Sequence, residues 1–216
     1  MRKAKIYIDL SVFINLDYLT GIQRVSEEII LRLLKNKNTN IVLITYSEEN
    51  ECFRIINNET FTECCENKIK DKSVCITDKY LKIHEMESGA VFFDIDSVWC
   101  CKFTRSKLYP LLKNQNIKII THVYDIIPIT HPQYCHENTV MFFIEYLGAT
   151  LKYANHLIVN TQATADRIKT ICDKMNRKMP GCTVAPLGCD FKKANDKKKL
   201  SLRPMYKISS TQANTY

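Results

Sequence analysis

Residues 5–34 read KIYIDLSVFINLDYLTGIQRVSEEIILRLL, and this stretch decides the fold. It begins with a short apolar run that ends in a carboxylate at Asp9, a pattern typical of a buried strand. After a loop, apolar residues recur at spacings of three and four. This spacing predicts a helix whose apolar stripe is formed by Ile22, Val25, Ile29, Ile30, Leu33 and Leu34.

The start of this helix has the features of an anion site. Thr20 is followed three places later by Gln23, a capping-box pattern that predicts a helix beginning at Gly21. The first N–H groups of such a helix are unpaired and face the crevice in which open α/β sheets bind ligands. Gly21 permits close approach and Arg24 adds a positive charge, so Thr20, Gly21 and Arg24 are predicted to bind a phosphate. The alternative is an ordinary capped helix with a surface arginine.

Length and composition favour an α/β domain in a reducing compartment. The chain has 216 residues, of which 45% are hydrophobic, enough for one sizeable α/β domain or two small ones. Its ten cysteines contain no Cys-x-x-Cys pair. The sequence shows no secretory segment and no apolar run of membrane-spanning length. We therefore expect free thiols and a cytoplasmic location.

The net charge of +8 is concentrated at one end of the chain. Residues 192–216 contain seven Lys or Arg and one Asp, a net charge of +6, which leaves +2 for residues 1–191. A nucleic-acid-binding surface across the domain is therefore not expected. Residues 1–191 are predicted to form a Rossmann-like domain, and residues 192–216 a basic polar tail that is a linker or disordered.

Strand and helix patterns alternate along the rest of the chain. Strands are expected at 40–46, 53–56, 73–77, 89–94, 117–124, 156–160 and 182–185, and helices at 59–69, 105–114 and 137–154 and after a cap at Thr161. In the helix at 105–114, Leu108, Leu111 and Leu112 should face inward, and Pro110 should lie near the helix start or kink it. This alternation predicts a doubly wound, mainly parallel sheet.

Five local motifs in one order resemble a known family. They are YIDLS at 7–11, LTGIQRV at 19–25, VYDIIPI at 123–129, ANHLIVNT at 154–161 and VAPLGCD at 184–190. Together they resemble the amino-terminal half of a family-4 retaining glycosyltransferase, in particular the mannosyl- and rhamnosyl-type enzymes of bacterial surface polysaccharide assembly. The resemblance implies one half of a GT-B fold, in which two Rossmann-like domains face a cleft and the amino-terminal one mainly holds the acceptor.

The resemblance also implies roles for residues of this chain. Gly21 with Thr20 and Arg24 would approach the donor phosphate, and Asp125 with His122 would be the catalytic residues at the cleft. Asp9, Tyr124 and Asn160 would bind the acceptor. Relatives commonly have His-Asp where this chain has Tyr124-Asp125, a departure from the family pattern. The co-substrate would be a nucleotide-sugar, with no metal cofactor.

The family's second domain supplies the groups that bind the donor, and no residues after Asp190 match them. The expected function is that of a truncated or split transferase, with the donor domain on a separate chain. It would transfer a hexose to a saccharide or lipid-linked saccharide at the inner face of the membrane. The alternative is a non-catalytic relic of the acceptor domain that serves as a binding or interaction module.

Several of these residues also have simpler interpretations. Asp125 would cap the bend before Pro128, and His122 would be a hydrogen-bonded core histidine. The run at 141–144 would either contact a membrane peripherally or pack on the sheet.

Two further groups of side chains suggest sites in their own right. His122, His131, Cys135 and His136 would be conceivable zinc ligands, although their spacing fits no usual site. Asp94 and Asp96 would be paired catalytic carboxylates or solvated strand-end acids.

Overall fold

The computed structural model describes residues 3–16 and 18–188, and within them it contains an eight-stranded sheet of order β4-β3-β2-β1-β5-β6-β7-β8. The strands are β1 (Lys5–Asp9), β2 (Asn40–Ser47), β3 (Cys52–Ile56), β4 (Ile76–Leu81), β5 (Val91–Asp94), β6 (Lys118–Val123), β7 (His156–Val159) and β8 (Gly181–Val184). The strands β2-β1-β5-β6-β7-β8 all pair in parallel. At one edge of the sheet, β3 pairs antiparallel with β2, and β4 pairs antiparallel with β3. The predicted α/β class with a mainly parallel sheet is confirmed.

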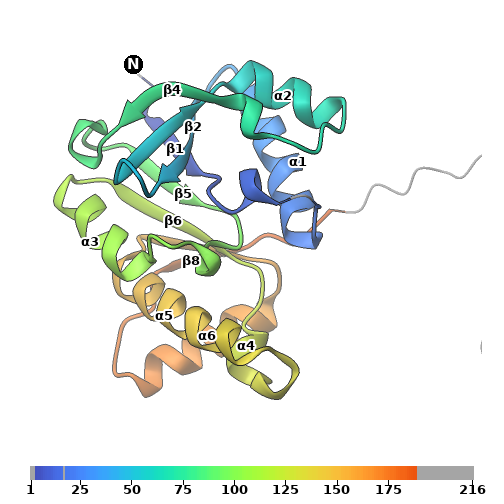
Figure 1. Ribbon diagram of the computed structural model, residues 1–216. Coiled ribbons are helices and arrows are strands. Elements are labelled where there is room, and N and C mark those ends of the chain that lie inside the picture. Colours follow the sequence, from blue (N-terminus) through green and yellow to red (C-terminus); the bar gives the residue numbers. More distant parts are fainter. Residues whose placement is uncertain (1–2, 17, 189–216) are drawn as a thin grey trace, which may run out of the picture.

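The helices form layers on both faces of the sheet (Figure 1). They are α1 (Gly21–Lys35), α2 (Asn58–Glu66), α3 (Arg105–Asn114), α4 (Ile127–Thr130), α5 (Glu137–Tyr153) and α6 (Gln162–Lys174). The chain runs from β1 to β2 in one direction and from β5 towards β8 in the other. Parallel strands are connected by right-handed crossovers, through α1 in the first direction and through α3, α5 and α6 in the second. As a result α1 lies on one face of the sheet, and α3, α5 and α6 lie on the other. The direction reverses between β1 and β5, and this switch point is where doubly wound sheets bind ligands.

The core follows these layers. On the α1 side, buried apolar residues include Ile8, Leu43, Ile30 and Phe61. The opposite face holds two clusters, one around α3 with Tyr7, Phe92, Leu108 and Leu112, and one around α5 and α6 with Phe143, Leu157, Val159 and Ile168. The two faces of the sheet are therefore both apolar, as parallel sheets require.

Most predicted elements are confirmed with ends shifted by one or two residues. The main exception is the predicted strand at 73–77, because Ser73–Cys75 forms a 3-10 turn and β4 begins only at Ile76. The helix predicted at 59–69 ends at Glu66. The side chain of Thr161 caps α6 as predicted, accepting a hydrogen bond from the Thr164 N–H at 3.1 Å. The predicted domain end at residue 191 and the basic tail lie outside the described residues.

The predicted capping box of α1 is wrong, although the helix does begin at Gly21. The Thr20 side chain makes no capping hydrogen bond to the helix backbone and contacts the side chain of Gln23 instead. The carboxamide of Gln23 is turned inward, because its N–H group donates to the buried carboxylate of Asp96. The predicted stripe is also only half right, since the fully buried face of α1 consists of Gln23, Ser26 and Ile30.

The predicted inward position of Leu111 is wrong as well. Leu108 and Leu112 are fully buried, but Leu111 is 43% exposed. The buried face of α3 also includes Arg105 and Tyr109, and on a 3.6-residue helix these four residues form one continuous arc that leaves Leu111 outside it. Pro110 does not lie near the helix start, because it is the sixth residue of this ten-residue helix.

This pair of leucines gives a matched test of the packing. We expect Leu112→Ala to lower the free energy of unfolding by about 2–5 kcal/mol, because it deletes fully buried methyl groups and leaves a cavity. Leu111→Ala should cost much less, about 0.5 kcal/mol, because that side chain is 43% exposed. Denaturant unfolding of both variants measures this, and equal losses would contradict the assignment of α3's buried face.

Candidate functional site

The first turns of α1 are fixed at the switch point by polar contacts. Ser26 Oγ donates to the Ile95 carbonyl at 2.8 Å, and Tyr124 Oη donates to the same carbonyl at 2.7 Å. Gln23 Nε2 donates to Asp96 Oδ1 at 2.6 Å. The start of the helix is thereby held against the chain that follows β5, which leaves its first N–H groups at the carboxyl edge of the sheet.

Gly21 and Thr20 lie exposed at this helix start. A Cβ atom added to Gly21 would meet nothing within 4 Å, and its φ is not in the left-handed region. The fold therefore does not require glycine here, and the space in front of the helix start is open.

Arg24, one turn into the helix, borders a groove of about 690 Å³. The groove lies between α1, the uncovered part of the sheet face and residues 185–188. It is lined by Arg24, Ile29, Phe93, His122, Ile158 and Leu187, among others. Two predicted site residues, Arg24 and His122, thus face one groove. This groove lies on the face of the sheet that α1 covers, whereas α3, α5 and α6 cover the opposite face.

His122, Tyr124 and Asn160 form one cluster at the ends of β6 and β7. The rings of His122 and Tyr124 are stacked with centroids 4.1 Å apart and an angle of 14°. Asn160 Nδ2 donates to the Tyr124 carbonyl at 3.2 Å, so its Oδ1 faces His122 Nε2 at 2.8 Å. The backbone carbonyl of Tyr124 can only accept, so the amide NH₂ of Asn160 must face it and the amide oxygen must face His122. An amide oxygen also only accepts, so His122 carries a hydrogen on Nε2.

The environment of His122 favours the neutral imidazole. Its side chain is 3% exposed, and burial lowers its pKa, against the opposing effect of the hydrogen bond to Asn160. With Nε2 donating to Asn160, the acceptor nitrogen of the neutral ring is Nδ1.

Asp125 is exposed and lies in a turn. Its Oδ1 accepts the Ile127 N–H at 2.9 Å, which is the bend-capping contact expected of a turn aspartate. It borders a different pocket, of about 240 Å³, which is rich in aromatic side chains and is lined by Ile22, Trp99, Tyr124, Phe143 and Tyr146, among others. Asp125 and His122 thus face separate pockets. Tyr124 lines the aromatic pocket with Asp125, and its ring stacks on His122, which lines the groove beside α1.

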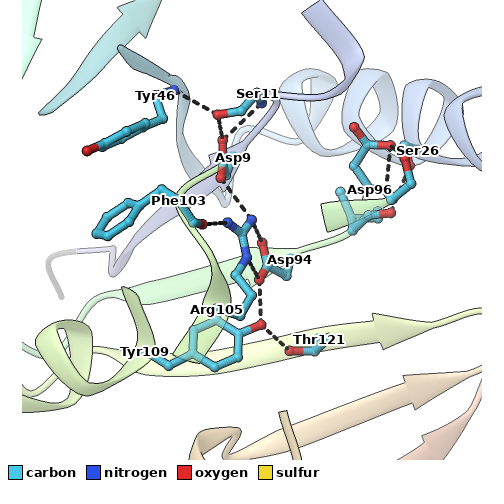
Figure 2. A network of polar contacts seen from close by, with 12 residues as sticks. Asp9, Ser11, Ser26, Tyr46, Asp94, Asp96, Phe103, Arg105, Tyr109 and Thr121 are labelled. Atoms are coloured by element: carbon cyan, nitrogen blue, oxygen red, sulfur yellow. Dashed lines mark hydrogen bonds and ion pairs between the residues drawn. The ribbon is translucent and has the colours of Figure 1, made fainter. Parts of the chain in front are cut away.

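Asp9 belongs to a buried charge network at the ends of β1 and β5 (Figure 2). Arg105 donates to Asp94 through Nε and Nη2, both at 2.7 Å, and to Asp9 Oδ2 through Nη2 at 2.8 Å. All three side chains are 1% exposed or less. Tyr109 donates to Asp94 at 2.5 Å. The expectation that the acids after β5 are solvated is wrong: Asp94 is paired with Arg105, and Asp96 is buried against Gln23 and Ser97.

Burial governs the ionisation of this network. Burial raises the pKa of Asp94, against the opposing effect of Arg105, and it likewise raises the pKa of Asp96. Burial alone would lower the pKa of Arg105, but the carboxylates of Asp94 and Asp9 raise it well above its usual range. The guanidinium therefore stays charged and holds both acids in place.

The conceivable zinc ligands do not assemble. Within residues 3–16 and 18–188, no three His, Cys, Asp or Glu side chains form a group that would hold a metal ion. His122 instead bonds Asn160, and His131 contacts Thr130 at 2.9 Å. The nine cysteines in the same ranges are free. No helix in the described ranges has the length and apolarity needed to cross a membrane.

The chain is similar to the serotype-specific mannosyltransferase WbdA of Escherichia coli. Two WbdA sequences are each 28% identical to it over 177 residues, which covers 76% of this chain and 19% of the relative. The chain thus spans about a fifth of the length of these relatives. No protein-family model matches the chain. The similarity supports a glycosyltransferase-like relationship, in agreement with the motifs in the sequence.

The sequence interpretation missed Arg105, Gln23 and Ser26, which position the candidate site. Arg105 was placed in a helix but not paired with a carboxylate. Gln23 was interpreted as part of a capping box, and Ser26 was assigned no role. One signal was present in the sequence: two strands end in acids at Asp9 and Asp94, and adjacent buried carboxylates require a cation nearby.

Removing the shared arginine should cause a large, pH-dependent loss of stability. Arg105→Met leaves Asp9 and Asp94 buried without their cation, so we expect a loss of about 3–5 kcal/mol at neutral pH. The pKa of Asp94, already raised by burial, should rise further. A carboxyl whose folded pKa exceeds its unfolded value adds stability at low pH and loses it as pH rises through the folded pKa.

The deficit of Arg105→Met should therefore shrink as the pH is lowered from neutral to mildly acidic. Denaturant unfolding at both pH values measures it. Arg167→Met, which changes an exposed arginine of α6, is the matched control and should lose little at either pH. A deficit that stays constant with pH would contradict the buried network.

His122 gives a second test. We expect nuclear magnetic resonance to show a neutral ring with its hydrogen on Nε2 at about pH 6.5, the ordinary pKa of histidine. Because the unfolded chain binds this proton more readily, stability should be lost as the pH falls below that value. Asn160→Asp should raise the pKa of His122 by placing a carboxylate beside Nε2. A doubly protonated ring in the unsubstituted protein at that pH would refute the assignment.

Proposed function

We propose that this chain is the acceptor-side domain of a sugar transferase. The complete enzyme would transfer a hexose from a nucleotide-sugar to a saccharide or lipid-linked saccharide during surface polysaccharide synthesis. The observation that supports this most is the 28% identity to a mannosyltransferase over 76% of the chain, together with a doubly wound sheet whose switch point is lined by polar side chains.

The proposed chemistry is mainly orientation and electrostatics, as transfer from a nucleotide-sugar requires. Thr20, Gly21 and Arg24 would face the departing diphosphate with open N–H groups and one positive charge. Asp125 would orient the acceptor hydroxyl, since the turn that holds one of its oxygens also fixes the direction of its carboxylate.

The remaining predicted residues have supporting roles in this proposal. His122 would act as a neutral hydrogen-bond acceptor through Nδ1, beside Asn160 and Tyr124 at the end of the acceptor region. Asp9 would contribute through its buried ion pair with Arg105. No metal is assigned a role in the reaction.

The donor half of the reaction requires a second domain or chain, which we propose as a partner. The location would be the cytoplasmic face of the membrane. Peripheral contact would use the exposed apolar side chains of α5, Met141, Phe142 and Ile144, which are 63%, 49% and 55% exposed. These side chains are on the water side of the helix and not packed on the sheet.

A second candidate is a non-catalytic binding module with the same fold. It is favoured by the turn contact of Asp125 and the neutral, buried His122, both of which an inactive descendant would retain. The two candidates share the fold and differ in whether the chain takes part in sugar transfer.

Calorimetric titration of the purified chain tests the proposal. We expect binding of manno-oligosaccharides, and weaker binding of nucleoside diphosphates through the start of α1. Arg24→Ala should weaken diphosphate binding by about tenfold, because it removes a charge-assisted contact. Gly21→Trp should weaken it by a similar factor, because its side chain blocks the approach to the helix start. Arg167→Ala, an exposed arginine of α6, is the matched control. No heat with either ligand class would refute the transferase proposal and favour the interaction module.

A further inference from the structure

A third pocket opens at the carboxyl edge of the sheet, among the loops that follow β1, β2 and β5. Its volume is about 380 Å³, within the usual range of small-molecule sites. Its lining includes Asp9, Ser11, Tyr46, Lys102, Phe103 and Arg105. It therefore lies at the switch point between β1 and β5, where the order of the strands reverses.

The floor of this pocket is charged and buried. Asp9 and Arg105 are both 1% exposed and form an ion pair of 2.8 Å. With Asp94 the network has two carboxyl groups paired with one guanidinium, so it offers no unpaired positive charge to an anionic ligand. Asp9 accepts bonds from the Ser11 N–H, the Ser11 hydroxyl and Arg105, and a carboxylate accepts about four in all. One position therefore remains for a hydroxyl donor.

One wall of the pocket is aromatic. The rings of Tyr46 and Phe103 are stacked with centroids 4.6 Å apart and an angle of 27°. The Tyr46 N–H donates to Ser11 Oγ at 2.7 Å, which joins this wall to the floor. Figure 2 shows both rings on one side of the Asp9 carboxylate. A flat apolar face beside a polar floor suits the C–H face of a sugar ring.

The rim supplies exchangeable polar groups. Lys102 Nζ lies 2.8 Å from Glu48 Oε1, and the two side chains come from the loops after β5 and β2. They are 77% and 57% exposed, so their ion pair contributes little to stability and can be exchanged for hydrogen bonds to a ligand. The rim thus offers one donor and one acceptor side chain.

We propose that this pocket binds one uncharged sugar ring of the saccharide acceptor. The inference rests on the proposed function and adds the position and charge class of the acceptor. An aromatic wall, mixed donors and acceptors, and a floor whose cation is already paired match a neutral polyol, whereas a phosphate or a uronic acid would meet the buried acids Asp9 and Asp94. The pocket is separate from the aromatic pocket that Asp125 borders.

The test uses the purified chain, manno-oligosaccharides as the probe, and two cysteines as reporters. Cys100 is exposed and lines this pocket, whereas Cys135 is half-buried and lines the pocket of Asp125. Alkylation by iodoacetamide is followed at each cysteine by mass spectrometry. We expect bound saccharide to slow alkylation of Cys100 several-fold and to leave Cys135 unchanged. This measurement needs no variant, so a folding defect does not affect it.

Variants provide the second readout. Tyr46→Ala should weaken saccharide binding about tenfold or more, because it removes the face on which the ring packs. Tyr80→Ala, which changes a 51% exposed tyrosine of β4, is the matched control and should bind as the unsubstituted protein does.

The outcomes separate this inference from the proposed function. Saccharide binding that protects only Cys135, equal affinities of the two tyrosine variants, or tighter binding of acidic than of neutral saccharides would overturn the pocket assignment and leave the transferase proposal standing. Absence of any saccharide binding would overturn both.

Discussion

The arrangement of the switch point depends on one arginine shared by two buried carboxylates. Because β1 and β5 are adjacent and parallel, their terminal acids Asp9 and Asp94 converge at one edge, where they would repel each other. Arg105 from the start of α3 bonds both. A buried ion pair adds little net stability over an apolar substitute, but losing one partner is costly. The network therefore fixes α3 relative to the two strands on which the candidate site is built.

The same edge is held from the other side by polar residues of α1. Gln23 and Ser26 occupy the buried face of the helix, where an apolar residue would normally lie, and bond to Asp96 and the Ile95 carbonyl. These bonds offset much of the cost of burying polar groups, although Asp96 Oδ2 is buried with no hydrogen-bond partner among the described residues. They fix where the helix begins, and so the position of its unpaired N–H groups.

The elements could be predicted from sequence because their signals are local, whereas the contacts at the site are not. Strand runs and the Thr161 cap depend on neighbours within a few residues, and they were found. Gln23 bonds a residue 73 positions away, and Arg105 bonds one 96 positions away. Periodicity contains no information on such partners. The same reason explains Leu111, since the burial of Arg105 and Tyr109, which depends on distant partners, decides which side of α3 faces inward.

The separation of His122 from Asp125 limits how the proposed reaction would be arranged. His122 and Arg24 face the groove on the α1 side of the sheet, whereas Asp125 and Ile22 line the aromatic pocket. The first turn of α1 contributes to both hollows, so it lies at the divide between them. In the proposed reaction, a ligand that reaches both the Asp125 carboxylate and the Arg24 guanidinium would cross the helix start near Gly21, where an added Cβ would meet nothing within 4 Å. The packing of the fold does not require an open helix start, so the space at Gly21 is consistent with the proposed role in ligand binding.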